Sequence, residues 1–206
     1  MKKIKYAFRI VHIDNIPHIL SNGFVHKKSH KADENYVAIG DDSVILTRND
    51  RVIYNNKSIG DFIPFYFGPR SPMLYVIQHG YNGVKQYNAE YIVYCVLKLE
   101  NILLHNLKCC FTDGHAISNL TTVYGGKCLN KIDELINYKD VYASNWKDEY
   151  DRDLKRRKEA ELLFEDEIPA ELISGFIVYN DDAKKKLQDW GVDEKRIIVK
   201  PNYYFE

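Results

Sequence analysis

The hydrophobic pattern of the chain indicates mainly β-structure. In some short runs apolar and polar residues alternate, and in others apolar residues continue over the length of a strand. Few of these runs have the spacing of an amphipathic helix. We predict seven strands on this basis, over residues 6–12, 62–67, 73–78, 91–97, 176–179, 196–199 and 203–205. Many strands without a regular strand–helix–strand alternation indicate the α+β class.

Helix-capping residues and helical spacing predict three short helices. Residues 14–15, Asp-Asn, can cap a helix that has Pro17 in its first turn and Gly23 at its C-terminal cap. Apolar residues recur with helical spacing over residues 129–136. Residues 183–190 have the same character and are followed by another glycine, which favours a helix ending there.

The segment Ala-Glu-Leu-Leu-Phe at residues 160–164 fits either a helix or a strand, and we interpret it as a strand. Alternation then places Glu161 on the face opposite Ala160, Leu162 and Phe164. By contrast, residues 26–60 are polar and irregular, which is more typical of a functional loop or lid than of core.

Composition indicates a globular protein without a strong charge bias. The chain has 206 residues, 45% of them hydrophobic and 28% charged, and no linker or repeat divides it, so we predict one domain over residues 1–206. The 29 basic and 29 acidic residues give zero formal net charge. A protein that coats duplex DNA has a basic excess, so any contact with nucleic acid must be short and local.

The cysteines have neither the spacing of a zinc site nor a disulfide framework, and Cys95 lies in an apolar run typical of a core thiol. The chain has no signal-peptide pattern and no apolar stretch of membrane-spanning length. We therefore expect a cytoplasmic monomer that binds no metal and no membrane.

Common catalytic signatures are absent: the chain has no Walker loop, GxGxxG after a strand, GxSxG or HExxH. On pattern alone His12 is typical of a satisfied strand histidine, and the basic run at 155–158 of a solvated face. Four stretches, which include this histidine and this basic run, nevertheless stand out as more than scaffold, and these are R-I-V-H-I-D-N at 9–15, I-P-F-Y-F-G-P-R-S-P-M-L-Y at 63–75, F-T-D-G-H-A at 111–116 and K-R-R-K-E-A-E at 155–161.

Together with Ile39-Gly40, these stretches resemble, in the same order, the DarT family of DNA ADP-ribosyltransferase toxins, over nearly the whole chain from Tyr6 to Phe205. The resemblance implies the ADP-ribosyltransferase fold, with two small packed β-sheets and short helices around an NAD cleft. It also implies NAD⁺ as a substrate, single-stranded DNA as the acceptor, and a cognate macrodomain-type antitoxin that removes the ADP-ribose.

The resemblance also assigns roles by motif position. The catalytic carboxylate falls on Glu161 and the essential arginine on Arg48, with Arg51 as the alternative three residues further on. The residues expected to contact NAD⁺ are His12, Asn15, Arg9 and Tyr75. The residues expected to contact DNA are His115, Lys155, Arg156 and Arg157.

These residue types suit the reaction, because positive charge develops on the ribose as its bond to nicotinamide breaks. A carboxylate at Glu161 would stabilise that charge, and an arginine adds a permanent charge with a fork of donors. His12 can donate a hydrogen bond to the ribose. The base must be unstacked, which favours single-stranded DNA. The aromatic residues at 65–67 and Tyr75 either stack on a ring or belong to the sheet core.

Residues 26–60 and 121–150 depart from the family pattern, and the resemblance implies that these regions choose the acceptor base. Our first interpretation is thymine, with guanine as the alternative. A catalytically inactive NAD- or nucleic-acid-binding module is a third interpretation, which the intact Glu161 disfavours. ADP-ribosylation of a protein side chain is a fourth, disfavoured by the motifs at 63–75 and 111–116.

Overall fold

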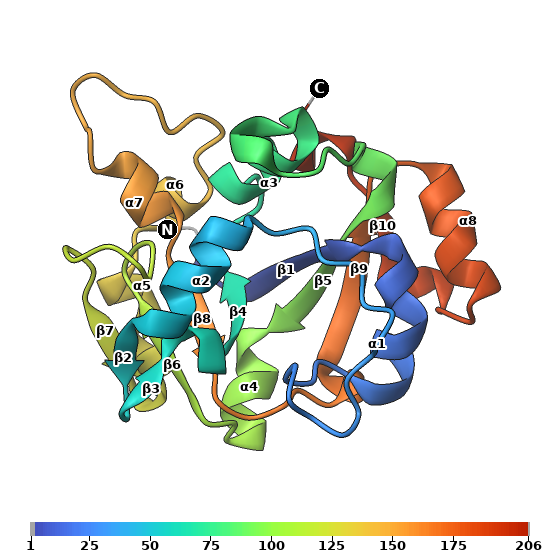
Figure 1. Ribbon diagram of the computed structural model, residues 1–206, viewed down its shortest axis with the longest axis horizontal. Coiled ribbons are helices and arrows are strands. Elements are labelled where there is room, and N and C mark those ends of the chain that lie inside the picture. The colour runs from blue at the N-terminus through green and yellow to red at the C-terminus, as the bar shows by residue number, and fades with distance from the viewer. Residues whose placement is uncertain (1–2, 206) are drawn as a thin grey trace.

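The computed structural model describes residues 3–205, and its core is a single mixed sheet (Figure 1). The order of the eight strands is β10-β9-β5-β1-β4-β8-β6-β7, and a hairpin of two further strands, β2 and β3, stands apart. The strands are β1 (Tyr6–His12), β2 (Val52–Tyr54), β3 (Lys57–Ser58), β4 (Ile63–Tyr66), β5 (Ile92–Lys98), β6 (Cys109–Thr112), β7 (Val123–Gly125), β8 (Glu161–Phe164), β9 (Ile173–Val178) and β10 (Ile197–Val199).

Short α-helices surround the sheet. They are α1 (Ile16–Asn22), α2 (Asp42–Asp50), α3 (Pro72–His79), α4 (Leu99–His105), α5 (Ile132–Leu135), α6 (Tyr138–Val141), α7 (Leu154–Lys158) and α8 (Asp181–Asp189). Helix α8 packs against β9 and β10 at one end of the sheet, and the β2–β3 hairpin lies at the other end (Figure 1). The segment that joins α6 to α7 projects from the body of the molecule.

The sheet consists of two four-stranded halves that meet at one point. Strand β1 is antiparallel to β5 along its whole length, from Tyr6 opposite Lys98 to His12 opposite Ile92. Its pairing with β4, in contrast, is a single register pair, Phe8 opposite Tyr66. The α+β class expected from the sequence is confirmed. The two expected sheets are the two halves of one sheet, which is nearly split between β1 and β4.

Strand β5 is apolar from Ile92 to Leu97 because both of its faces are buried there. Its residues alternate between the main core and a second apolar cluster, with Cys95 on the main-core side as predicted. Strand β8 follows the predicted alternation as well: Ala160, Leu162 and Phe164 pack in the main core. Leu163 faces a third, smaller cluster, and Glu161 shares that face. The carboxylate is therefore carried on a rigid central strand.

The strand predicted over residues 73–78 is wrong, because this segment is helix α3. Ser71 caps it by accepting a hydrogen bond from the Leu74 N–H at 3.2 Å, and Pro72 opens its first turn. It ends at Gly80, whose φ of 67° is the left-handed C-terminal cap. Leu74 and Ile77 form its buried face, so the apolar run has helical rather than strand spacing.

Two further predictions are corrected. Residues 42–50, within the stretch interpreted as irregular, form α2 behind an Asp41 cap; no residue of this helix is buried, so it has no apolar periodicity to detect. Residues 203–205 are not a strand, because Pro201–Tyr203 is a 3-10 turn. Tyr204 follows it and donates its hydroxyl to the carbonyl oxygens of Ile92 and Ile177.

Candidate active site

A buried carboxylate–guanidinium pair lies at the start of β8. Glu161 is fully buried, and Arg48 of α2 binds it through both arms of its fork, at 3.2 Å for Nη1–Oε1 and 2.9 Å for Nη2–Oε2. The Arg48 side chain is 12% exposed, so the guanidinium separates the carboxylate from solvent. The structure thus joins the two residues to which sequence comparison gave the catalytic carboxylate and the essential arginine.

The F-T-D-G-H-A motif is a turn wrapped around this carboxylate. The Ala116 N–H donates to Glu161 Oε1 at 3.0 Å, and the Glu161 N–H donates to Thr112 Oγ1 at 3.0 Å. Gly114 allows the turn to approach α7, because a Cβ there would lie 2.9 Å from the Arg156 carbonyl oxygen. Two residue types in the motif are therefore explained: Gly114 by the close approach of α7, and Thr112 by the hydrogen bond that its hydroxyl accepts from Glu161.

These contacts set the charge of the site. Burial alone would raise the pKa of Glu161, but the charges of Arg48 and His115 and the Ala116 N–H outweigh it and hold the pKa below its usual value. Burial lowers the pKa of the His115 imidazole against the attraction of Glu161. Glu161 is thus an anion held ready for a developing cation, beside a histidine whose protonated form is disfavoured by burial.

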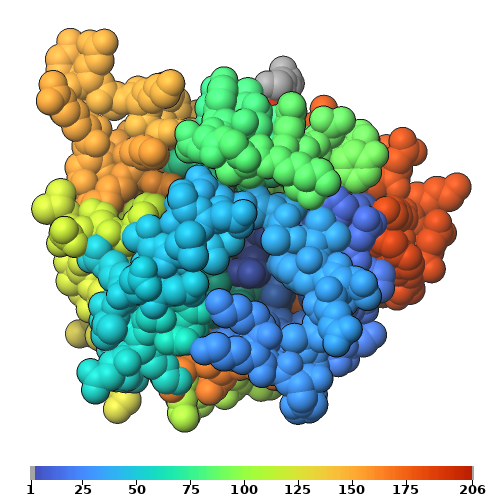
Figure 2. All heavy atoms as spheres, in the orientation of Figure 1, coloured from blue at the N-terminus to red at the C-terminus, as the bar shows by residue number. Residues whose placement is uncertain are grey.

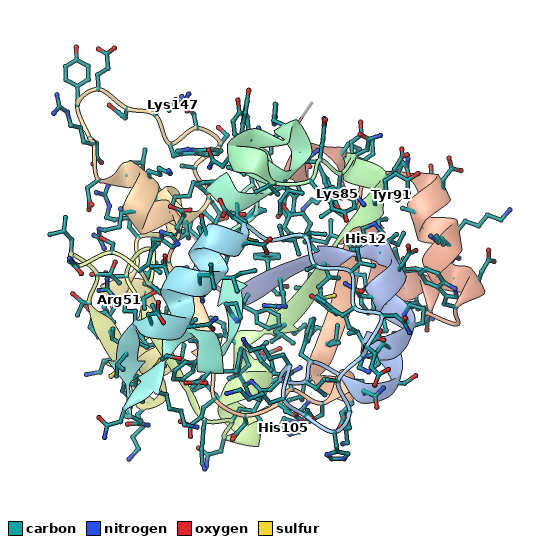
Figure 3. The ribbon with its side chains drawn as sticks, in the orientation of Figure 1. His12, Arg51, Lys85, Tyr91, His105 and Lys147 are labelled. Carbon is teal, nitrogen blue, oxygen red and sulfur yellow. The ribbon has the colours of Figure 1, made fainter. Side chains whose placement is uncertain are left out.

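Arg51, the alternative arginine, is turned away from Glu161. Its guanidinium binds the carbonyl oxygens of Ile117 and Ser118 and the side chain of Asn119. Figure 3 shows it on the side of α2 away from β1. Of the two arginines that the sequence left open, Arg48 is the one in contact with the carboxylate.

A cavity of about 280 Å³ opens where β1 and β4 cease to pair. Figure 2 shows this hollow between residues 25–41 and α2, with β1 at its floor. Arg9 lines it and donates from Nη1 to the Pro64 carbonyl oxygen at 2.9 Å, which bridges the two strands. The Nε–H of Arg9 is buried and has no partner among residues 3–205. Such an unpaired donor is typical of a site that a ligand completes.

The other predicted NAD⁺ contacts lie at the end of β1 and on α3. His12 is buried, with its ring stacked on Tyr91 at 5.9 Å, near Lys85 (Figure 3). Asn15 uses its side-chain amide to bind the backbone N–H and carbonyl of Val37, each at 2.9 Å, and so anchors the loop before α2. Tyr75 packs in an aromatic cluster with His79, Tyr81, Trp146 and Phe205.

The basic run on α7 is divided between structure and surface. Arg156 binds Asp113 and Asp153, and Arg157 binds a group of three aspartates, Asp140, Asp151 and Asp153. Lys155 is exposed and has no ion pair among residues 3–205. As DNA contacts all three remain predictions. The geometry gives both arginines a second task, which is to hold α7 against its neighbours.

Sequence reasoning missed two polar residues beside the site, and it named a third, Tyr66, only among the aromatic residues at 65–67. Tyr66 lies opposite Glu161 in the β4–β8 register. Lys158 is buried and donates to the carbonyl oxygens of Pro69 and Val141, each at 3.0 Å, so it fastens α7 to two other segments. Glu159 is buried beside His115. The only signal for Glu159 was its place two residues before Glu161, in a run that read as a solvated face.

A mixed α/β fold with a nearly split sheet, a cavity at the split and a buried Arg–Glu pair at the start of β8 fits the class of ADP-ribosyltransferases. The family model described as "ssDNA thymidine ADP-ribosyltransferase, DarT" matches residues 8–205. The chain belongs to the DarT family, and it is a DNA ADP-ribosyltransferase.

Individual relatives agree with this assignment. A DNA ADP-ribosyl transferase of Escherichia coli O127:H6 is 36% identical over 186 residues, which are 89% of this chain and 84% of that protein. A DNA ADP-ribosyl transferase–glycohydrolase fusion protein of Thermosipho africanus is 28% identical over 98% of this chain, which spans 50% of the fusion. Thermus sp. 2.9 DarT with ADP-ribosylated single-stranded DNA superposes with a TM-score of 0.83 at 25% identity, over the full length of both chains.

Two searches of the described residues concern membranes and metals. Within residues 3–205 no helix has both the length and the apolar character to cross a membrane. Across the same residues, no group of three or more His, Cys, Asp or Glu side chains could hold a metal ion.

Proposed function

We propose that this protein transfers ADP-ribose from NAD⁺ to thymine in single-stranded DNA, and that Glu161 and Arg48 form its catalytic centre. The observation that carries the proposal is the two-armed contact between Arg48 and the buried Glu161. As the bond to nicotinamide breaks, the carboxylate would face the positive ribose, and Arg48 would turn one arm toward the phosphates or the base.

NAD⁺ would lie along the hollow between β1 and β4. Arg9 contributes an unpaired donor there, His12 can bind the ribose, and Asn15 holds the loop that borders the cavity. Tyr75 would stack on the nicotinamide or on a base from the aromatic cluster on α3. On the opposite side, His115 and the cations of α7, Lys155, Arg156 and Arg157, would face the DNA.

The biological setting proposed is that of a toxin. The family description names single-stranded DNA thymidine as the acceptor, and the Thermosipho relative joins a transferase to a glycohydrolase. We therefore propose a partner of macrodomain type that removes the modification, and a cytoplasmic, monomeric enzyme of one domain.

Labelling of defined oligonucleotides tests the acceptor. With NAD⁺, we expect a thymine-containing single strand to gain ADP-ribose far faster than the matched duplex, because a chain of zero net charge has little means to hold or open duplex DNA. A single strand without thymine serves as the control. Persistent labelling of that control would indicate guanine, and labelling of protein alone would contradict the proposal.

A further inference from the structure

A second carboxylate, Glu159, lies next to the catalytic centre. The residue is 7% exposed, and its carboxylate accepts no hydrogen bond from the residues that the structure describes. Its ion-pair neighbour is His115, with Nδ1 4.0 Å from Glu159 Oε2. A carboxylate that is nearly buried and has no hydrogen bond from the protein loses much of its hydration, so its presence beside a functional site calls for a role.

The backbone fixes this pair in place. The N–H groups of His115 and Glu159 both donate to the carbonyl oxygen of Arg156, at 2.9 Å and 3.1 Å. One residue further along the turn, the Ala116 N–H binds the carboxylate of Glu161. The backbone around His115 is therefore tied to the segments that carry both carboxylates, and its imidazole lies near Glu159 and within the electrostatic influence of Glu161.

The transfer reaction needs a proton acceptor. The bond between C1′ of the ribose and nicotinamide breaks with its electron pair, so nicotinamide, charged in NAD⁺, leaves neutral. Thymine in DNA carries one ring N–H, at N3, and the new N3–C1′ bond forms with loss of that proton. Glu161 is a poor acceptor for it, because the Ala116 N–H still holds Oε1 when one arm of Arg48 turns away, and the neighbouring donors and charges keep the pKa of the carboxyl below its usual value.

We propose that His115 accepts the N3 proton and that Glu159 is the positioning residue that makes it able to do so. The Glu159 carboxylate faces Nδ1, which leaves Nε2 free to take the proton. The same carboxylate then stabilises the imidazolium that results. This inference rests on the proposed thymine-modifying function and deepens it.

The charges around the pair predict how the step depends on pH. Burial raises the pKa of Glu159 to about 7; Lys155 and Lys158 oppose this rise and Glu161 adds to it. Among the charges near His115, Glu161 raises the pKa of the imidazole, whereas Arg48, Lys155 and Arg51 lower it. The Glu159 carboxyl loses its proton as the pH rises through neutrality, so the rate of transfer should rise over the same range.

The pH profile of Glu159→Gln tests the inference. We expect kcat for a thymine oligonucleotide to fall at least about tenfold and its rise near neutral pH to disappear, with KM for NAD⁺ unchanged. Glu171→Gln, which removes an exposed carboxylate of the turn before β9, is the matched control and should keep the parent profile. Glu159→Asp keeps the charge but withdraws it from His115, so we expect its rate to be intermediate. This variant carries the test if Glu159→Gln folds poorly.

A more acidic acceptor separates a proton-transfer role from a structural one. 5-Bromouracil has the volume of thymine and a more acidic N3–H, so the defect of Glu159→Gln should shrink on a bromouracil oligonucleotide. Combined with His115→Ala, Glu159→Gln should add little further loss.

Two different results would contradict two different claims. A parent protein that leaves thymine unlabelled contradicts the proposed function. An active parent whose Glu159→Gln variant keeps the same rate and pH profile contradicts the inference about Glu159. The inference is also contradicted if Glu159→Gln is equally defective on thymine and bromouracil oligonucleotides and its loss adds in full to that of His115→Ala.

Discussion

At the scale of single residues, Arg48 controls the state of the site. Glu161 has no access to water, and a buried anion without a partner is strongly unfavourable. The guanidinium offsets that cost and keeps the carboxylate ionised where positive charge must develop. The same contact blocks the carboxylate in the free protein, so we infer that substrate must displace part of it.

Removal of the Arg48 guanidinium should therefore lower the stability of the fold by an amount that depends on pH. The pKa of Glu161 in the folded protein is held low, so its contribution to stability is complete above the ordinary glutamate range and is lost as the pH falls through the folded value. We expect Arg48→Ala to lower the free energy of unfolding by about 3 kcal/mol at neutral pH. In acid this difference should narrow, because Glu161 becomes protonated in both proteins.

Urea unfolding of the parent and Arg48→Ala proteins at neutral and acid pH measures this effect. Arg48→Lys retains a charge without the fork and should lie between the two. If the free energies of unfolding of the parent and Arg48→Ala differ by the same amount at both pH values, the charge of Glu161 is not what Arg48 stabilises.

At the scale of elements, the turn at 112–116 and helix α7 form one unit around the carboxylate. Arg156 ties Asp113 of the turn to Asp153 at the start of α7, and Arg157 gathers the aspartates of the neighbouring segments. Cations engaged in this way have little freedom left to follow a nucleic-acid backbone. Lys155 keeps that freedom, since it is exposed and free of ion pairs within residues 3–205.

The basic run should therefore separate into two kinds of residue. In a Glu161→Gln background that prevents turnover, Lys155→Ala should flatten the dependence of oligonucleotide affinity on salt by about 0.7 in log–log slope, with folding unchanged. We expect Arg157→Ala to lower stability by about 1 kcal/mol, because its aspartates lose a shared partner. Binding across a salt series and thermal unfolding measure the two effects. If Arg157→Ala folds normally and changes the salt dependence of oligonucleotide affinity more than Lys155→Ala does, then Arg157 rather than Lys155 is the DNA contact.

At the scale of the whole molecule, the sequence predicted the α+β class and the strand that carries Glu161. The buried faces of β5 and β8 leave a clear apolar pattern. What it did not predict has physical reasons: α2 buries no apolar residue, so no hydrophobic periodicity marks the helix that carries Arg48. The apolar run in α3 has strand-like composition, and only the spacing of Leu74 and Ile77 and the caps at Ser71 and Gly80 identify a helix.

The candidate site was predictable in part. Family motifs indicated Glu161 and Arg48, but the choice between Arg48 and Arg51 needed the path of α2 over β8. No local pattern could indicate that Glu159 is buried beside His115, because that contact joins a turn and a helix end more than forty residues apart. Long-range contacts of this kind depend on the sheet order rather than on local sequence.

The most direct test locates the adduct itself. The parent and Glu161→Gln proteins, both checked for folding by thermal unfolding, are incubated with NAD⁺ and a single-stranded oligonucleotide that contains one thymine. Tandem mass spectrometry should find one ADP-ribose on the thymine nucleotide with the parent and none with Glu161→Gln. An adduct made by the folded Glu161→Gln protein, or one found only on other bases, would contradict the assignment of this site to thymine modification.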